Sequence, residues 1–181
     1  MTARRLFVFA FAAALLVGFG CSNDPAPSGP VLGCSDGGAA GANVVTTSCG
    51  GALDAVTEQV DVVIGGPAAG NTTLRGLNFD LTFDDTKLVF VPAANYASPL
   101  FPNALVAVSS PQTNRVIVSI QQTGADPAIS VGTGEHVVLS LSFKTVPGTT
   151  FGATPLTFEN TEATTPSATI TYADGVLLAY Q

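Results

Sequence analysis

Short runs in which apolar and polar residues alternate constrain this sequence more than any other feature. In the most regular run, LNFDLTF (77–83), every second residue is apolar. Alternation with a period of two places the apolar side chains on one face of a β-strand, and no window of the sequence shows a helical period. Comparable runs or short strand segments occur at Val56–Ile64, Leu88–Val91, Leu105–Val108, Arg115–Gln121, Val137–Phe143, Leu156–Phe158, Ile170–Tyr172 and Val176–Tyr180.

Turn-forming residues separate these runs, as in Gly65-Gly66-Pro67, Pro147-Gly148 and Asp174-Gly175. Connections this short favour antiparallel neighbours. Because each strand has one apolar face, two sheets must pack against each other to bury those faces. The sequence therefore predicts an all-β fold, a two-sheet antiparallel β-sandwich of jelly-roll type with about nine strands. The low share of charged residues, 10%, fits this fold class.

The first twenty residues are typical of an export signal. Arg4-Arg5 precede an uncharged apolar run, Leu6–Phe19, which is shorter than the roughly 20 residues that a membrane-spanning helix needs. Gly20-Cys21 then resembles a bacterial lipobox, although Gly18 stands where Leu or Val is usual. We expect a lipoprotein-type signal peptide at residues 1–20 and a lipid on Cys21. Ordinary cleavage that leaves Cys21 as a free thiol is the alternative.

This signal predicts an exported protein that is anchored by its lipid to the bacterial cell envelope, at the outer membrane or cell surface. Residues 21–43 are rich in Gly, Pro, Ser and Ala, which predicts a flexible tether that contains half of a disulfide loop. Residues 44–181 would form the folded domain. In an exported chain the two remaining cysteines, Cys34 and Cys49, are most simply one disulfide, worth about 3 kcal/mol.

A metal site at these cysteines is the competing interpretation. The sequence has a single histidine, His136, far from them and no second cysteine pair, so no metal and no cofactor are expected. Loss of the signal removes Arg4 and Arg5 and no acids, so four basic residues then face thirteen acidic ones and the formal charge falls from −7 to −9. Such a surface repels phosphate backbones, which argues against nucleic acid as a partner.

Several motifs resemble those of cohesin domains. The segment LRGLNFDLTFDDTKLVFV resembles the cohesin strand that runs into an aromatic-Asp turn and then a Leu-led strand; here Phe83-Asp84 is the pair and Leu88 the leucine. NRVIVSIQQTGADPAIS, GEHVVLSLSFKTVPGTT and ITYADGVLLAY resemble later cohesin strands in the same order. The resemblance covers residues 44–181.

The resemblance implies a non-catalytic module that binds another secreted or surface protein, by family default a dockerin-like module. It also implies that the sheet face containing the quoted strand is the partner-binding face, with Gly76, Asn78, Asp80 and Thr82 turned outward. In cohesins, Asn and Asp commonly contact the dockerin at the first two of these positions, so Gly76 departs from the pattern. The same polar residues also suit the solvent side of any antiparallel strand.

Two further sets of residues have functional and structural interpretations. Asp84-Asp85 could be a carboxylate pair or calcium ligands, but their place between two strands favours a turn in which Asp side chains accept hydrogen bonds from the backbone. Tyr96 and Phe101, in the loop YASPLFPN, are possible platforms for a sugar ring in a chain without Trp. A carbohydrate-binding module for a polysaccharide is therefore the alternative function, and a structural or adhesive envelope subunit is the third.

Overall fold

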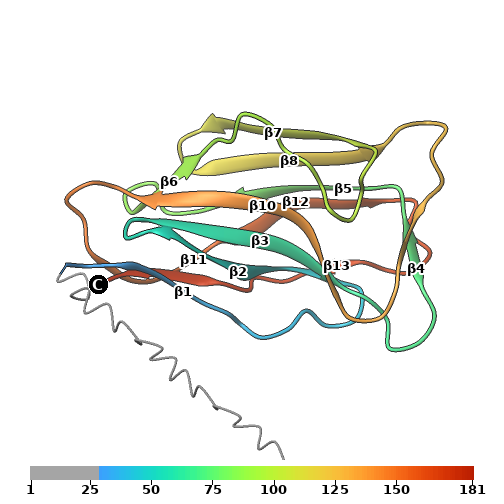
Figure 1. Ribbon diagram of the computed structural model, residues 1–181, viewed down its shortest axis with the longest axis horizontal. Helices are drawn as coiled ribbons and strands as arrows, with labels where there is room; N and C mark the ends of the chain where they lie inside the picture. The colour runs from blue at the N-terminus through green and yellow to red at the C-terminus, as the bar shows by residue number, and fades with distance from the viewer. Residues whose placement is uncertain (1–28) are drawn as a thin grey trace, which may run out of the picture.

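A computed structural model describes residues 29–181, which form fourteen β-strands and no helix (Figure 1). The predicted all-β sandwich is confirmed, with more strands than the nine expected. Among the described residues no helix is long and apolar enough to cross a membrane. The predicted signal peptide, Cys21 and the first part of the tether lie outside the described residues.

The strands are short, and several are separated by a few residues. Their bounds are β1 Leu32–Ser35, β2 Val44–Asp54, β3 Thr57–Gly65, β4 Thr72–Leu74, β5 Gly76–Thr82, β6 Leu88–Val91, β7 Ala104–Gln112, β8 Arg115–Gln122, β9 Ile129–Val131, β10 Glu135–Thr145, β11 Phe151–Pro155, β12 Thr157–Thr164, β13 Thr171–Tyr172 and β14 Leu177–Tyr180.

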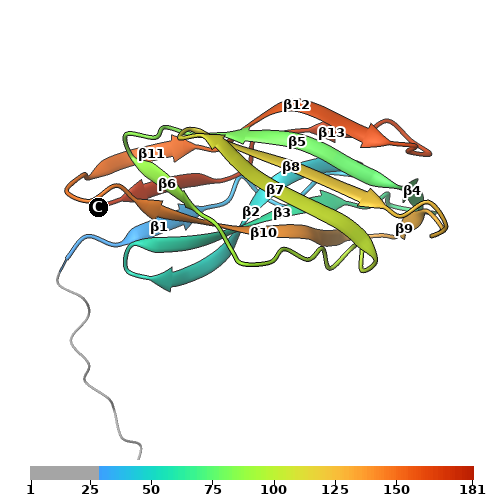
Figure 2. The same cartoon turned by 90° about the horizontal axis from the view of Figure 1, so that it is seen from above.

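Two sheets form the sandwich. The front sheet has the order β12-β5-β8-β7, and the back sheet has the order β13-β2-β3-β10-β6. A three-stranded sheet, β1-β14-β11, and the pair β4-β9 complete the described chain. All paired strands are antiparallel except β13 and β2, which run parallel. In Figure 1, β7 and β8 of the front sheet lie on the side of the molecule opposite β2 and β1, and in Figure 2 the front sheet crosses over β2, β3 and β10 of the back sheet.

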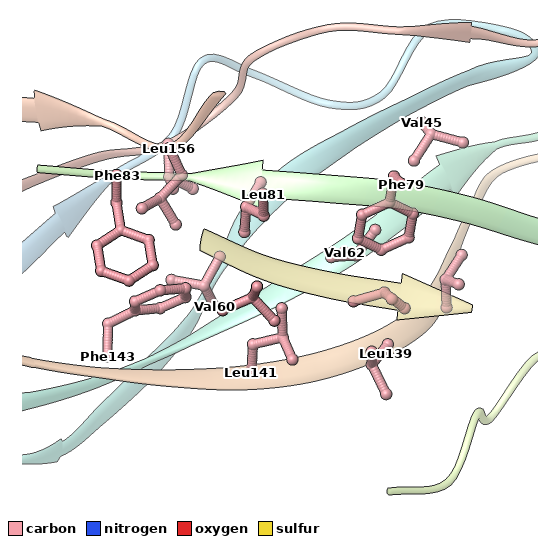
Figure 3. Close-up of a cluster of buried hydrophobic side chains, with 14 of the residues drawn as sticks. Val45, Val60, Val62, Phe79, Leu81, Phe83, Leu139, Leu141, Phe143 and Leu156 are labelled. Atoms are coloured by element: carbon pink, nitrogen blue, oxygen red, sulfur yellow. The ribbon is translucent and has the colours of Figure 1, made fainter. Parts of the chain in front are cut away.

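The core lies between these two sheets and follows from the alternation in the sequence. Phe79 and Leu81 of β5 and Leu141 and Phe143 of β10 are buried (Figure 3), and Leu77 of β5 is buried as well. Burying each such side chain contributes about 1.5–3 kcal/mol relative to leaving it in water. The inner face of β5 is therefore fixed, and its intervening residues must face outward.

The folded domain begins earlier than predicted. β1 lies within the predicted tether, yet it pairs with β14, and Leu32 is 1% exposed in the core. The disulfide between Cys34 and Cys49 forms, with their Cα atoms 5.8 Å apart, and joins β1 to β2. The boundary at residue 44 is therefore wrong. A four-residue strand with one large apolar residue is too short to show alternation against its Gly-rich surroundings.

Other strands were missed for related reasons. β2, with the sequence VVTTSCGGALD, has no apolar alternation, although it pairs with β3 along most of its length. Its last residues project at the β2–β3 hairpin, where Leu53 is exposed. β9 and β11 are three and five residues long. Strands that are held by pairing, and contribute little to the core, leave a weak signal in a sequence.

Candidate functional site

The outer face of the front sheet is the candidate site. The register of β5 with β8 and of β8 with β7 places rows of side chains across it. These outward residues are Gly76, Asn78, Asp80 and Thr82 of β5; Arg115, Ile117, Ser119 and Gln121 of β8; Leu105, Ala107 and Ser109 of β7; and Thr157, Glu159, Glu162 and Thr164 of β12.

The part of this face formed by β7 and β8 carries three exposed apolar residues among polar ones. Leu105 is 70% exposed and Ile117 is 36% exposed, and the exposed Ala107 lies diagonally across from Ile117. We call Leu105, Ala107 and Ile117 the apolar patch. A contiguous exposed apolar patch rimmed by polar residues is typical of an interaction surface, whereas scattered single residues are not.

The part formed by β5 and β12 is polar and internally hydrogen-bonded. The Oδ1 atom of Asn78 accepts hydrogen bonds from Ser119 Oγ at 2.7 Å and from Gln121 Nε2 at 3.2 Å. Its Nδ2 atom donates to Glu162 Oε2 at 3.3 Å. Because Asn78 is half-buried and already bonded on both sides, it orders the polar part of the face, and a partner would reach Glu162 more easily than Asn78.

Asp80 is buried in this face by its neighbours on the same sheet. Its Oδ2 atom accepts a hydrogen bond from Asn160 Nδ2 at 2.6 Å and lies 3.4 Å from Arg115 Nη1. Arg115 Nη2 lies 3.2 Å from Glu159 Oε2. One guanidinium thus serves two carboxylates, which leaves this corner of the face with a net negative charge.

A bulge in β12 brings Asn160 to Asp80. The pairing of β12 with β5 shifts between Glu159 and Glu162, and Asn160 has a φ of 47°. Asn adopts this left-handed conformation more readily than most residues, because its short side chain can hydrogen-bond locally. The bulge therefore places an amide over Asp80 and turns the neighbouring β12 residues toward solvent.

The two remaining predicted face residues are also partly enclosed. Gly76 is buried, and a Cβ atom there would lie 2.3 Å from the Ile120 carbonyl oxygen, so a side chain cannot be accommodated without movement. Thr82 is half-buried, and its Oγ1 donates to the Thr157 carbonyl at 3.2 Å. Of the four predicted residues, Asn78 and Thr82 reach the surface in part, whereas Gly76 and Asp80 do not.

The sequence interpretation missed the most exposed members of the face. Leu105, Ala107 and Ile117 belong to the runs ALVAV and RVIVSI, in which consecutive residues are apolar on both faces of the strand. In a sandwich strand that has one face in the core, apolar residues in both phases indicate an apolar outer face. Glu159 and Glu162 could not be assigned, because the bulge in β12 breaks the alternation.

Asp84 and Asp85 form a turn, as predicted. Asp84 Oδ1 accepts a hydrogen bond from the Thr86 amide at 3.1 Å, and Lys87 Nζ lies 2.8 Å from Asp84 Oδ2. The hydrogen bonds from Lys87 and then Thr86 lower the pKa of Asp84 to about 2. Asp85 accepts a hydrogen bond from Thr113 Oγ1, which ties this turn to the β7–β8 turn. Asp84 thus has partners on both carboxylate oxygens, whereas Asp85 is exposed and accepts one hydrogen bond.

The possible sugar platform is not supported at Phe101. Its ring is 1% exposed and belongs to the core, so it presents no face to a sugar. The loop around it is fastened by Ser98, whose Oγ donates to the Val138 carbonyl at 2.6 Å. Tyr96 is half-buried, and its hydroxyl accepts a hydrogen bond from the Ala93 amide at 2.8 Å. The apolar character of YASPLFPN reflects packing.

One group of possible metal ligands occurs in the described residues, Cys34, Asp36 and Cys49. The two cysteine sulfurs are bonded to each other in the disulfide, so neither is available as a thiolate ligand. Asp36 Oδ1 accepts a hydrogen bond from the Cys49 amide at 2.5 Å. These contacts fix β1 to β2, and each potential metal ligand already has a structural partner.

No protein-family model matches this sequence, and no curated protein is significantly similar to it. Several solved structures share its fold. CaCohA2 from Clostridium acetobutylicum is 17% identical with a TM-score of 0.53, covering 81% of this chain and 88% of that chain. A non-cellulosomal cohesin from Archaeoglobus fulgidus is 16% identical with a TM-score of 0.53, covering 74% and 87%.

The sixth cohesin of scaffoldin B from Acetivibrio cellulolyticus, in complex with a mutant Cel5 dockerin, is 15% identical with a TM-score of 0.53, covering 73% of this chain and 94% of that chain. The chain therefore has a cohesin-like fold, as the motifs in its sequence predicted.

Proposed function

We propose that this chain is a non-catalytic, extracytoplasmic binding module that docks another secreted or surface protein through the outer face of the front sheet. The observation that carries the proposal is the exposed apolar patch of Leu105, Ala107 and Ile117 beside an ordered polar network. An apolar centre with a polar rim is the common composition of a protein-docking surface. Association would remove the patch from water, and the preordered network around Asn78 would limit the entropy lost on binding.

A dockerin-type module is the proposed partner. Support comes from the shared fold of a cohesin that was solved in complex with a dockerin. The contacts would differ from those expected from the sequence, because Asp80 is engaged with Arg115 and Asn160. The patch would supply the buried contacts, and the exposed Glu159 and Glu162 of β12 would attract basic side chains at the rim of the interface.

The protein would act at the cell envelope, held by a lipid on Cys21. The Cys34–Cys49 disulfide supports export, because structural disulfides persist in oxidising compartments. Replacement Cys21→Ser tests the anchor. The unchanged chain should fractionate with membranes and incorporate a labelled fatty acid, while the variant should be recovered as soluble protein without the label. Equal membrane fractionation of both forms would contradict lipid anchoring.

The docking face is tested by capture of secreted proteins on the immobilised chain from residue 22 onward. Ile117→Lys places a charge in the patch, and Leu177→Lys is the matched control, since Leu177 is similarly exposed on β14. The chain and the control should retain the same dockerin-containing protein, and Ile117→Lys should retain at least tenfold less of it.

Two outcomes would overturn the docking proposal. Equal retention by all three proteins would exclude the outer face as the binding surface. Retention on an insoluble polysaccharide, with no protein captured, would favour the carbohydrate-binding alternative. In that case Tyr96→Ala would test whether the remaining loop aromatic contributes to sugar binding.

A further inference from the structure

A second apolar site lies between the last strands of the two sheets. β6 ends the back sheet and β7 ends the front sheet, and neither pairs with another strand of residues 29–181 on its outer side. A cavity of about 540 Å³ opens between them, next to the β5–β6 turn. We call this cavity the slot. It is separate from the apolar patch, because Leu105, Ala107 and Ile117 do not line it.

The lining of the slot is apolar along β6 and mixed toward β7 and the β7–β8 turn, where Ser109, Ser110, Gln112 and Thr113 accompany Val108 and Pro111. Leu88 and Phe90 of β6 are buried in its wall, Val108 of β7 is half-buried opposite them, and Val89 is 47% exposed. Asp85 is the sole charged residue among those that line it. A ligand for this slot must therefore bury apolar groups and tolerate, or neutralise, a carboxylate.

The N-terminal segment of the same chain does not fit the slot. The described chain enters the fold near β1, and Figure 1 places β1 on the side of the molecule opposite β7. The sequence between Cys21 and β1, SNDPAPSGPV, contains an acid, three prolines and one large apolar residue at its end. It offers neither the apolar side chains nor the positive charge that the slot calls for.

A second copy of the chain fits no better. Leu53, 58% exposed, is the apolar residue that a second copy would present at its β2–β3 hairpin, and Asp54 follows it directly. Inserting that hairpin into the slot would bring Asp54 toward Asp85, and two chains of formal charge −9 would repel each other at longer range. Like charges brought together at an interface disfavour that pairing.

We propose that the slot binds an extended segment of another protein, apolar at alternate positions and carrying a Lys or Arg that reaches Asp85. The unpaired edges of β6 and β7 provide backbone groups for an added strand, and the slot receives its alternate side chains. Pro92 and Pro111 lie among the lining residues and lack amide donors, which limits backbone pairing to a short segment. This inference is independent of the docking function proposed for the outer face.

The experiment is selection from a random dodecapeptide display library on the chain from residue 22 onward. This chain lacks Cys21, so neither a free thiol nor a lipid at that position interferes. Val89→Lys places a charge in the slot and serves for counter-selection, while Leu177→Lys is the matched control. Enriched peptides should alternate apolar residues and carry a net positive charge. A selected peptide should slow amide hydrogen exchange in β6, which contributes no residue to the apolar patch.

Affinity measurements on that peptide give the expected magnitudes. Val89→Lys should weaken binding at least tenfold, and Leu177→Lys should leave it unchanged. Asp85→Asn should weaken it by about twofold to fivefold, the range for a partly exposed ion pair. Replacement of the peptide's basic residue by Glu should weaken binding further.

Three results would overturn the proposal. These are failure to enrich peptides, equal binding to Val89→Lys, and exchange protection confined to β7 and β8, the strands of the apolar patch, with none in β6. The last result would support the outer docking face while excluding the slot, so the two proposals can fail separately. Concentration-dependent dimers that Val89→Lys abolishes would instead assign the slot to a second copy.

Discussion

The two long sides of the sandwich differ in what fills the space between the sheets. On the side of β12 and β13, the Phe158 ring lies 5.3 Å from that of Phe79 and 5.5 Å from that of Tyr172, measured between centroids. The Tyr172 hydroxyl donates to the Glu162 carbonyl at 2.8 Å, which ties the two sheets together. On the side of β6 and β7, the slot remains between the sheets.

This difference separates residues that stabilise the fold from residues that are free to bind. A side closed by packed aromatic rings cannot admit a ligand without losing those contacts, so its substitutions should appear as changes in stability. On the side with the open slot, the apolar lining is exposed to water in the folded chain. Substitutions there should therefore affect binding more than folding. Substitutions on the two sides should therefore differ most in stability at Phe79 and least at Val89.

Replacement of Phe79 by Ala should have the largest effect. Phe79 is 1% exposed and contacts both aromatic residues of the closed side, so Phe79→Ala should lower the free energy of unfolding by about 4 kcal/mol. Phe90→Ala is the matched control on the open side. It should cost at least 1 kcal/mol less, because water can enter the space beside the slot. Urea unfolding measures both, and equal losses would contradict the comparison.

The disulfide should contribute the next largest effect. It holds β1, an edge strand that contributes Leu32 to the core, against β2. Cys34→Ser with Cys49→Ser should lower the free energy of unfolding by about 3 kcal/mol. Adding a reductant should lower the stability of the unchanged chain to that of the double variant and leave the variant unaffected. A loss below about 1 kcal/mol would show that pairing with β14 holds β1 without the disulfide.

Tyr172 should make the closed side sensitive to high pH. Burial, and then the nearby Glu162 carboxylate, raise the pKa of the Tyr172 hydroxyl above its usual value. The unfolded chain then loses this proton first, near pH 10, so stability should be constant below that pH and fall as the pH rises further. Tyr172→Phe should cost about 1 kcal/mol at neutral pH through the lost hydrogen bond and make the decline shallower.

Absorbance at high pH measures the same effect directly. The difference in tyrosinate absorbance between the unchanged chain and Tyr172→Phe isolates the ionisation of Tyr172, which should occur above the usual pH range of a tyrosine as long as the chain is folded. Ionisation of Tyr172 near pH 10 in the folded chain would contradict the assignment.

The sequence predicted the parts of this structure that repeat a simple pattern. Alternation in β5, β8 and β10 identified the core faces, because each of these strands buries one face fully. The cohesin-like order of strands could be recognised from the motifs around them. The start of the domain could not be predicted, since β1 depends on Leu32 and on pairing with β14, and neither leaves a periodic signal.

The candidate site was predicted less completely than the fold. Alternation correctly places Asn78 and Asp80 on the outer face, but their exposure depends on neighbours from other strands. Asp80 is buried by Arg115 and by Asn160 at the β12 bulge, and no rule of spacing along the chain relates these residues. The slot could not be foreseen at all, because it depends on which strands end the two sheets.

The smallest expected change in stability is at Val89. Because its side chain is 47% exposed beside the slot, Val89→Ala should alter the free energy of unfolding by less than about 0.5 kcal/mol. The same substitution should weaken a slot-bound peptide severalfold, since it removes apolar area that binding would bury. Urea unfolding and peptide titration on one sample give both values. A loss of stability above about 1.5 kcal/mol would mean that Val89 closes this side as the aromatic rings close the other, and the separation between a structural side and a binding side would then fail.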